Sequence, residues 1–85
     1  MKIFYTKKFE REYKKLSREI KLKIELREVI FRKDPYSPTL KTHKLSGELE
    51  DFLSFSIDFK YRIVFEFIDD KDVFFHSVGD HDIYK

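Results

Sequence analysis

The sequence contains no cysteine, so neither a disulfide framework nor a cysteine-ligated metal site is possible. A chain of 85 residues without disulfides must be held together by the packing of its side chains. The absence of cysteine fits the reducing environment of the cytoplasm, which is the location that we expect.

The sequence also has few glycines and shows no metal-binding pattern. The two glycines, Gly47 and Gly79, are too few for a glycine-rich phosphate-binding loop. The three histidines are scattered and show neither His-x-His nor His-x₃-His spacing. The acidic segment 69–72 lacks the glycine and the distant glutamate of a calcium loop. The sequence therefore predicts no metal ion and no other cofactor.

Long apolar runs are absent as well. No stretch approaches the roughly 20 apolar residues that a membrane span needs. Residues 1–8 lack the hydrophobic run of a signal peptide. We therefore expect no membrane partner for this chain.

Large aromatic residues, by contrast, are abundant, with ten Phe and five Tyr. A chain this short buries only ~60% of its unfolded surface, so its core depends on large side chains. The length leaves room for one domain, which we place at residues 1–85.

The small net charge of +2 conceals a strong asymmetry. Residues 1–44 hold 14 basic and 6 acidic side chains, whereas residues 45–85 hold 4 basic and 10 acidic ones. A basic half suggests a polyanionic partner. Charge alone, however, favours a plainer explanation, in which two helices expose solvated Lys and Arg side chains.

The first half of the chain predicts one strand and two helices. Residues 1–5 form a short apolar segment typical of a strand, and Thr6 can cap a helix. Phe9, Tyr13 and Leu16 then recur at helical spacing.

The second helix is expected from Ser17, its N-cap, to Lys33, because the Asp34-Pro35 pair stops it. Residues 20–27 alternate like a strand, but two apolar helical stripes and good helix formers favour a helix. The stripes comprise Leu22, Leu26, Val29 and Ile30 on one side and Ile20, Ile24 and Phe31 beside them.

The second half predicts a meander of three strands. A proline-containing loop at 34–39 leads through residues 40–45 to a turn at Ser46-Gly47. The expected strands are 52–58, 59–68 and 73–78, and Phe59 belongs to the apolar face of the second. The order β-α-α-β-β-β indicates an α+β fold, with two helices packed on a mainly antiparallel sheet.

The C-terminal segment concentrates groups that can move protons or hold phosphate. Arg62 lies on the second strand of the meander, on the side opposite to the expected core. A guanidinium can grip a phosphate through two parallel N–H bonds, although a cross-strand ion pair would explain Arg62 nearly as well. His81 and Tyr84 follow Gly79 near the end of the chain. Together these residue types suggest phosphodiester chemistry on RNA.

His81 is the candidate general acid. An unperturbed imidazole titrates at about pH 6.5, and nearby Asp80 and Asp82 would favour its protonated form. Tyr84 could stack on a base or simply anchor the C-terminus to the sheet. His43 could be a second proton carrier or an ordinary loop histidine. His76, in mid-strand, is interpreted as structural or as a peripheral neighbour of the site.

The order of elements and three short motifs resemble the RelE/YafQ/ParE superfamily of type II toxins. The motifs are His43-Lys44-Leu45-x-Gly47, Tyr61-Arg62-Ile63-Val64-Phe65 and the ending Gly79-x-His81-x-x-Tyr84. The resemblance covers essentially the whole chain, and it implies a small microbial RNase-like fold and neutralisation by a co-encoded antitoxin. RelE-like and YafQ-like members cleave mRNA on the ribosome, whereas ParE-like members poison DNA gyrase.

The resemblance also implies roles for individual residues. Arg62 falls on the position that contacts phosphate, His81 on the proton donor and Tyr84 on the C-terminal aromatic residue. His43 matches a YafQ-like histidine, and Lys41 and Lys44 fall where RelE-like members keep lysines.

The sequence also departs from the family pattern. Ser56 and Lys60 replace a histidine and an aspartate of the YafQ-like pattern, so that proton relay is incomplete. We count Lys60, together with Lys41 and Lys44, as a predicted RNA- or phosphate-binding residue.

These observations predict a ribosome-dependent mRNA endonuclease that uses the 2′-hydroxyl as its nucleophile. The expected partners are an acidic cognate antitoxin, the ribosome and mRNA, with DNA contacted only indirectly through the antitoxin complex. Two alternatives stay open: a ParE-like gyrase inhibitor without catalysis, and a degenerate toxin that only binds its antitoxin.

Overall fold

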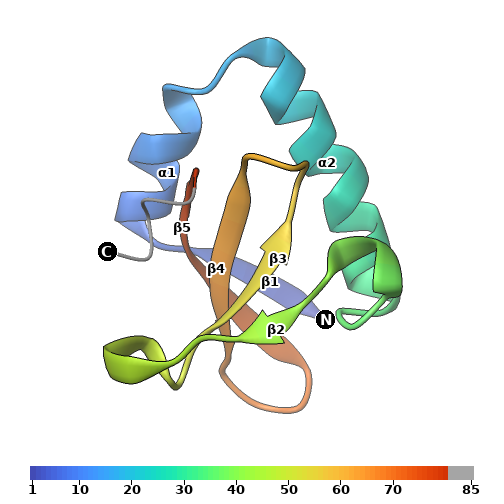
Figure 1. Ribbon diagram of the computed structural model, residues 1–85, viewed down its shortest axis with the longest axis vertical. Helices are drawn as coiled ribbons and strands as arrows, with labels where there is room; N and C mark the ends of the chain where they lie inside the picture. Colours follow the sequence, from blue (N-terminus) through green and yellow to red (C-terminus); the bar gives the residue numbers. More distant parts are fainter. Residues whose placement is uncertain (81–85) are drawn as a thin grey trace.

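The computed structural model describes residues 1–80, which form two helices and a five-stranded sheet (Figure 1). The strands are β1 (Lys2–Tyr5), β2 (His43–Lys44), β3 (Leu53–Ser56), β4 (Arg62–Phe67) and β5 (Asp72–Gly79). The helices are α1 (Lys7–Lys14) and α2 (Arg18–Lys33), and two short 3₁₀ turns are η1 (Pro38–Leu40) and η2 (Gly47–Leu49). The predicted α+β class is confirmed.

Both helices begin at the predicted caps. The Thr6 hydroxyl accepts a hydrogen bond of 3.0 Å from the N–H of Phe9, and the Ser17 hydroxyl accepts one of 3.3 Å from the N–H of Ile20. Thr6 also donates to the carbonyl of His76 at 2.8 Å, which ties the start of α1 to β5. The helices join near Ser17 and diverge from there (Figure 1).

The sheet has the strand order β1-β5-β4-β3-β2. β1 runs parallel to β5, and every other neighbouring pair is antiparallel. β2, which pairs with β3, was not predicted: it has only two residues, too few for any alternation to reveal. It gives the sheet an edge strand that carries His43.

The core lies between the sheet and α2 and is built from aromatic rings. Phe31 of α2 is fully buried, and its ring centroid lies 4.9 Å from those of Phe55 and Phe65 and 5.3 Å from that of Phe75. Phe9 of α1 joins this cluster through Phe75 at 5.7 Å. Both helices therefore cover the same face of the sheet.

Three of the four residues in one predicted stripe of α2 point away from the core, and the fourth, Ile30, packs against it. Ile24 and Phe31 are buried, whereas Leu22, Leu26 and Val29 are 52%, 68% and 55% exposed. The helical periodicity was therefore predicted correctly from apolar residues that do not all pack inside.

Phe59 was expected on the apolar face of a strand, and that expectation is wrong. The strand β3 ends at Ser56, β4 begins at Arg62, and Phe59 lies in the turn between them with 87% of its surface exposed. Asp58 explains the early turn, because its Oδ1 accepts hydrogen bonds from the N–H groups of Lys60 at 2.9 Å and Tyr61 at 2.8 Å.

A cleft of about 500 Å³ separates α1 from α2 and is lined by Tyr5, Phe9, Glu10, Tyr13, Lys14, Ile24, Glu25 and Glu28. The Tyr5 hydroxyl donates to Glu28 Oε1 at 2.5 Å. Burial raises the pKa of Tyr5 to about 12, the hydrogen bond to Glu28 and its charge add to the rise, and Arg32 opposes it.

This raised pKa predicts a specific loss of stability in alkali. Between pH 10 and about 12 the unfolded chain ionises Tyr5 and the folded chain does not, so the free energy of unfolding falls as the pH rises. In Tyr5→Phe this alkaline decrease in the free energy of unfolding should be smaller by about 1 kcal/mol. The value is reduced to allow for the solvent exposure of the ring. Urea unfolding at pH 9.5 and 11.5 measures it, with the exposed Tyr36→Phe as control. An equal alkaline loss in Tyr5→Phe would contradict the assignment.

Neither helix within residues 1–80 is long and apolar enough to cross a bilayer.

Candidate functional site

The sheet register brings several predicted site residues onto the face that the helices leave uncovered, which we call the outer face. His43, Ser54, Val64 and Ser77 pair in one row across β2, β3, β4 and β5. The next row contains Ser56, Arg62 and Gly79. Since side chains two residues apart on a strand share a face, Arg62 lies on the same face as Val64 and hence as His43.

Arg62 is anchored by the turn that precedes it. Its Nη1 donates to the carbonyls of Asp58 at 2.6 Å and Tyr61 at 3.0 Å. These two bonds use one nitrogen of the guanidinium. The Nε and Nη2 groups, which form the edge suited to bidentate phosphate binding, donate to no group in residues 1–80. The cross-strand ion pair considered for Arg62 does not form within these residues.

Asp58 holds this turn in place. Besides its two backbone hydrogen bonds, its Oδ2 lies 3.3 Å from the Lys23 ammonium of α2. Burial alone would raise the pKa of Asp58, but the N–H groups of Tyr61 and Lys60 and the ammonium of Lys23 outweigh burial and lower it. The carboxylate is therefore charged at neutral pH and its charge is compensated locally.

His43 projects from the edge strand β2 with its tautomer fixed. Its Nδ1 lies 3.1 Å from the carbonyl oxygen of Lys41. A carbonyl can only accept, so Nδ1 carries the proton and the neutral ring presents an unprotonated Nε2. Lys41 adopts the left-handed conformation (φ 53°), which turns the chain so that its carbonyl reaches the ring. A pocket of about 270 Å³, lined by Lys44, Leu45, Ser46 and Leu49, adjoins His43.

His43 and Arg62 share the outer face but are not in contact. They are two strands apart and offset by one row, which places their α-carbons roughly 12 Å apart by standard sheet dimensions. Both side chains are accessible, since His43 is exposed and Arg62 half-buried. Ser54 and Val64, which lie between them in the register, are buried.

His81 and Tyr84 lie outside the described residues. The described chain does approach this region beside Arg62, because Gly79 of β5 is the direct partner of Arg62 on β4. The chemistry assigned to His81 and Tyr84 from the sequence stays a prediction.

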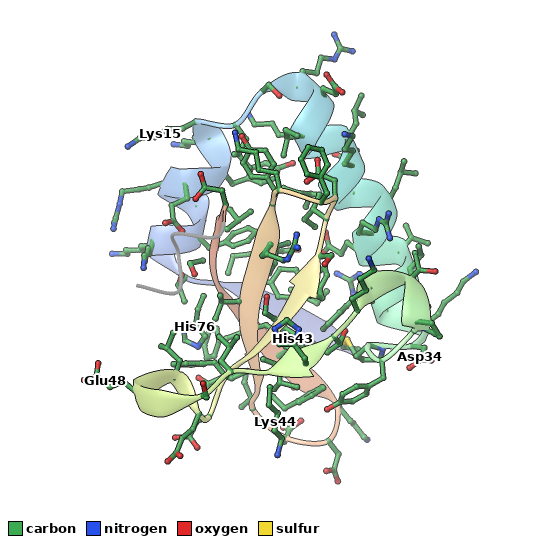
Figure 2. All side chains as sticks on the ribbon, viewed as in Figure 1. Lys15, Asp34, His43, Lys44, Glu48 and His76 are labelled. Atoms are coloured by element: carbon green, nitrogen blue, oxygen red, sulfur yellow. The ribbon has the colours of Figure 1, made fainter. Side chains whose placement is uncertain are left out.

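The three lysines of the predicted site occupy different places. Lys60 belongs to the same turn as Arg62, with its ammonium 5.4 Å from the centre of the Tyr61 ring. Lys41 is exposed beside His43, whose ring it orients through its carbonyl. Lys44 leaves β2 in the direction opposite to His43 (Figure 2). The structure thus groups Lys60 with Arg62 and Lys41 with His43.

A second histidine on the outer face is the feature that sequence reasoning undervalued. His76 Nε2 lies 2.8 Å from Glu66 Oε1, and the imidazole also meets the Phe52 ring at 4.7 Å. His76 follows the core residue Phe75 on β5, so the alternation of the strand places it on this face, as Glu66 is placed by following Phe65 on β4. The carboxylate and the imidazole fall on neighbouring strands in the sequence, which was the available signal for their pairing.

The fold is shared with solved toxin structures, as comparison with YafQ and with a YoeB/ParE toxin shows. The YoeB/ParE toxin from Agrobacterium tumefaciens superposes with a TM-score of 0.80 at 18% identity, over 95% of this chain and 99% of that one. YafQ from E. coli gives a TM-score of 0.71 at 19% identity, over 95% of this chain and 93% of that one. YafQ in the E. coli DinJ–YafQ complex gives 0.68 at 20% identity, with the same coverage of 95% and 93%.

No protein-family model matches the sequence, and no curated protein matches it either. At about one identical residue in five, the structural likeness establishes the shared fold, and the activity of this chain must be argued from its own residues.

Proposed function

We propose that this chain is the toxin of a type II toxin–antitoxin pair and that it cleaves mRNA on the ribosome. The observation that carries the proposal is the guanidinium of Arg62, fixed by two backbone carbonyls with its phosphate-binding edge unoccupied by residues 1–80. An arginine kept only for an ion pair would have a carboxylate partner, and within residues 1–80 Arg62 has none.

The proposed reaction is attack of the 2′-hydroxyl on the adjacent phosphate, which leaves a cyclic phosphate and a free 5′-hydroxyl. Arg62 offsets the negative charge that develops on the phosphate oxygens. His43 is suited to accept the 2′-hydroxyl proton, because its neutral ring presents the lone pair of Nε2. His81 would protonate the leaving 5′-oxygen, and Tyr84 would position the nucleotide. DNA lacks the attacking hydroxyl and would be spared.

The proposed partners follow from the same scheme. YafQ has been crystallised with the antitoxin DinJ, and we propose an acidic antitoxin for this chain as well. The exposed apolar stripe of Leu22, Leu26 and Val29 on α2 offers such a partner a surface to cover. The ribosome and mRNA are the proposed targets in the cytoplasm, and DNA would be reached only through the antitoxin complex.

A pair of assays separates this proposal from its main competitor. Purified protein added to translating ribosomes should produce mRNA fragments with 5′-hydroxyl ends, and it should leave gyrase supercoiling unaffected. Gyrase inhibition without mRNA cleavage would assign the chain to the ParE-like class. Neither activity, together with antitoxin binding, would indicate a degenerate toxin.

Replacement of His43 tests the role of its free nitrogen. His43→Ala should lower the rate of ribosome-dependent cleavage by about 10²-fold, because a general base contributes at least that much. The pH profile of cleavage should also differ between the wild type and the variant, because the variant lacks the proposed base.

The control for His43 is Glu48→Gln, an exposed side chain on η2 away from the outer-face rows. It should keep both the rate and the pH profile of the wild type. A pH profile that is unchanged in His43→Ala would show that His43 is not the base.

A further inference from the structure

Phe59 is the most exposed large apolar side chain in residues 1–80, with 87% of its surface in contact with solvent. Within the same residues its ring packs against no other aromatic ring. A phenylalanine in this setting contributes nothing to the core, so its presence in the turn calls for another role.

The turn that carries Phe59 is rigid. Asp58 accepts from the N–H groups of Lys60 and Tyr61, and Ile57 N–H donates to the Tyr61 carbonyl at 2.9 Å. Arg62 closes the turn from the other side through the carbonyls of Asp58 and Tyr61. The Phe59 ring is therefore displayed on a fixed backbone, and binding through it would cost little ordering of the chain.

The surroundings of Phe59 favour an anion. The one carboxylate of the turn, Asp58, is already compensated by Lys23 of α2 at 3.3 Å. Lys60 and Arg62 add two cations to the same turn, and Arg62 keeps its Nε–Nη2 edge available within residues 1–80. An aromatic ring in the same turn as cations that form no ion pair within residues 1–80 matches single-stranded nucleic acid, which combines a base that stacks with a phosphate that carries charge.

We propose that the turn from Asp58 to Arg62 is a base-stacking site for unpaired RNA, in which a nucleobase lies on Phe59 and its neighbouring phosphate is held by Arg62 and Lys60. The inference rests on the proposed function and extends it, since it names a contact that positions RNA next to the reacting phosphate. Stacking on a ring is tolerant of sequence, so this site supplies affinity and position more than codon choice.

A fluorescence titration tests the site directly. The probe is a single-stranded RNA hexamer that carries one 2-aminopurine and 2′-O-methyl groups, which prevent cleavage. Binding to the wild type should change the 2-aminopurine fluorescence. Phe59→Leu should abolish that change and weaken binding about 10-fold, as the loss of one stacked base predicts. Phe59→Tyr should restore both.

Two comparisons make the test specific. Tyr36→Leu removes another exposed aromatic residue far from the turn in sequence and should bind like the wild type. Lys60→Ala should weaken binding and reduce the salt dependence by about one phosphate contact, whereas Phe59→Leu should leave the salt dependence unchanged.

The outcomes separate this inference from the proposed function. RNA binding that is equal in Phe59→Leu and the wild type overturns the stacking site, even if ribosome-dependent cleavage is observed. Weaker antitoxin binding with unchanged RNA binding would instead make the turn a protein contact and also overturn it. A wild type that binds no hexamer rejects the site as well. The nuclease proposal is rejected only if the wild type shows no ribosome-dependent cleavage.

Discussion

Replacing Arg62 with lysine should lower ribosome-dependent mRNA cleavage by about 10²- to 10³-fold, nearly as much as replacing it with alanine. Lysine would keep the positive charge but has a single ammonium group. In the structure one guanidinium nitrogen is bound to the carbonyls of Asp58 and Tyr61 while the opposite edge is left for phosphate. One ammonium cannot perform both functions at once, so Arg62→Lys should behave as a loss of function.

The same contacts give Arg62 a structural role, which the experiment must separate from catalysis. Arg62→Lys and Arg62→Ala should therefore be compared with the wild type in urea unfolding and in antitoxin binding. We expect the variants to stay folded, because the hydrogen bonds of Asp58 hold the turn without Arg62. Full cleavage activity in Arg62→Lys would show that charge alone is needed, and the bidentate phosphate contact would be wrong.

Local signals in the sequence were sufficient to predict where helices begin and end, because capping and helix termination depend on neighbouring residues. Thr6 and Ser17 cap the helices as predicted, because hydroxyl groups satisfy free helical N–H groups. The Asp34-Pro35 pair ends α2 at the expected residue for steric reasons. The α+β class followed from these boundaries and from the alternation of the later strands.

Signals that depend on tertiary contacts were harder to interpret. Leu22 and Phe31 are both apolar helical residues, and their spacing does not reveal which of them faces the core. The predicted strand 59–68 began three residues before β4, because Phe59 and Tyr61 continue its alternation, yet the hydrogen bonds of Asp58 end the pattern. The strand β2 exists only because β3 supplies its hydrogen-bonding partners.

Part of the candidate site could be predicted from the sequence for the same reasons. The alternation of β4 placed Arg62 on the face away from the core, as the structure has it. The tautomer of His43 depends on a left-handed residue at Lys41. That feature has no signature in a single sequence, because it arises where the backbone departs from regular geometry.

The largest effect on stability should come from Phe31, which joins α2 to three strands. Its ring is fully buried and packs against Phe55, Phe65 and Phe75 at centroid distances of 4.9 to 5.3 Å. Phe31→Ala should lower the free energy of unfolding by about 3–5 kcal/mol, since it removes the buried surface and leaves a cavity among rings that cannot collapse into it. That loss is comparable to the whole stability of many small domains.

Urea unfolding monitored by circular dichroism measures the effect of Phe31→Ala, and Leu26→Ala on the solvent side of the same helix is the matched control. Leu26 is 68% exposed, so its replacement should change the free energy of unfolding by less than about 0.5 kcal/mol. Phe31→Leu should fall between the two, because it keeps most of the volume and loses the ring contacts. If Phe31→Ala were no less stable than Leu26→Ala, the packing of α2 on the sheet would have to be different from that described.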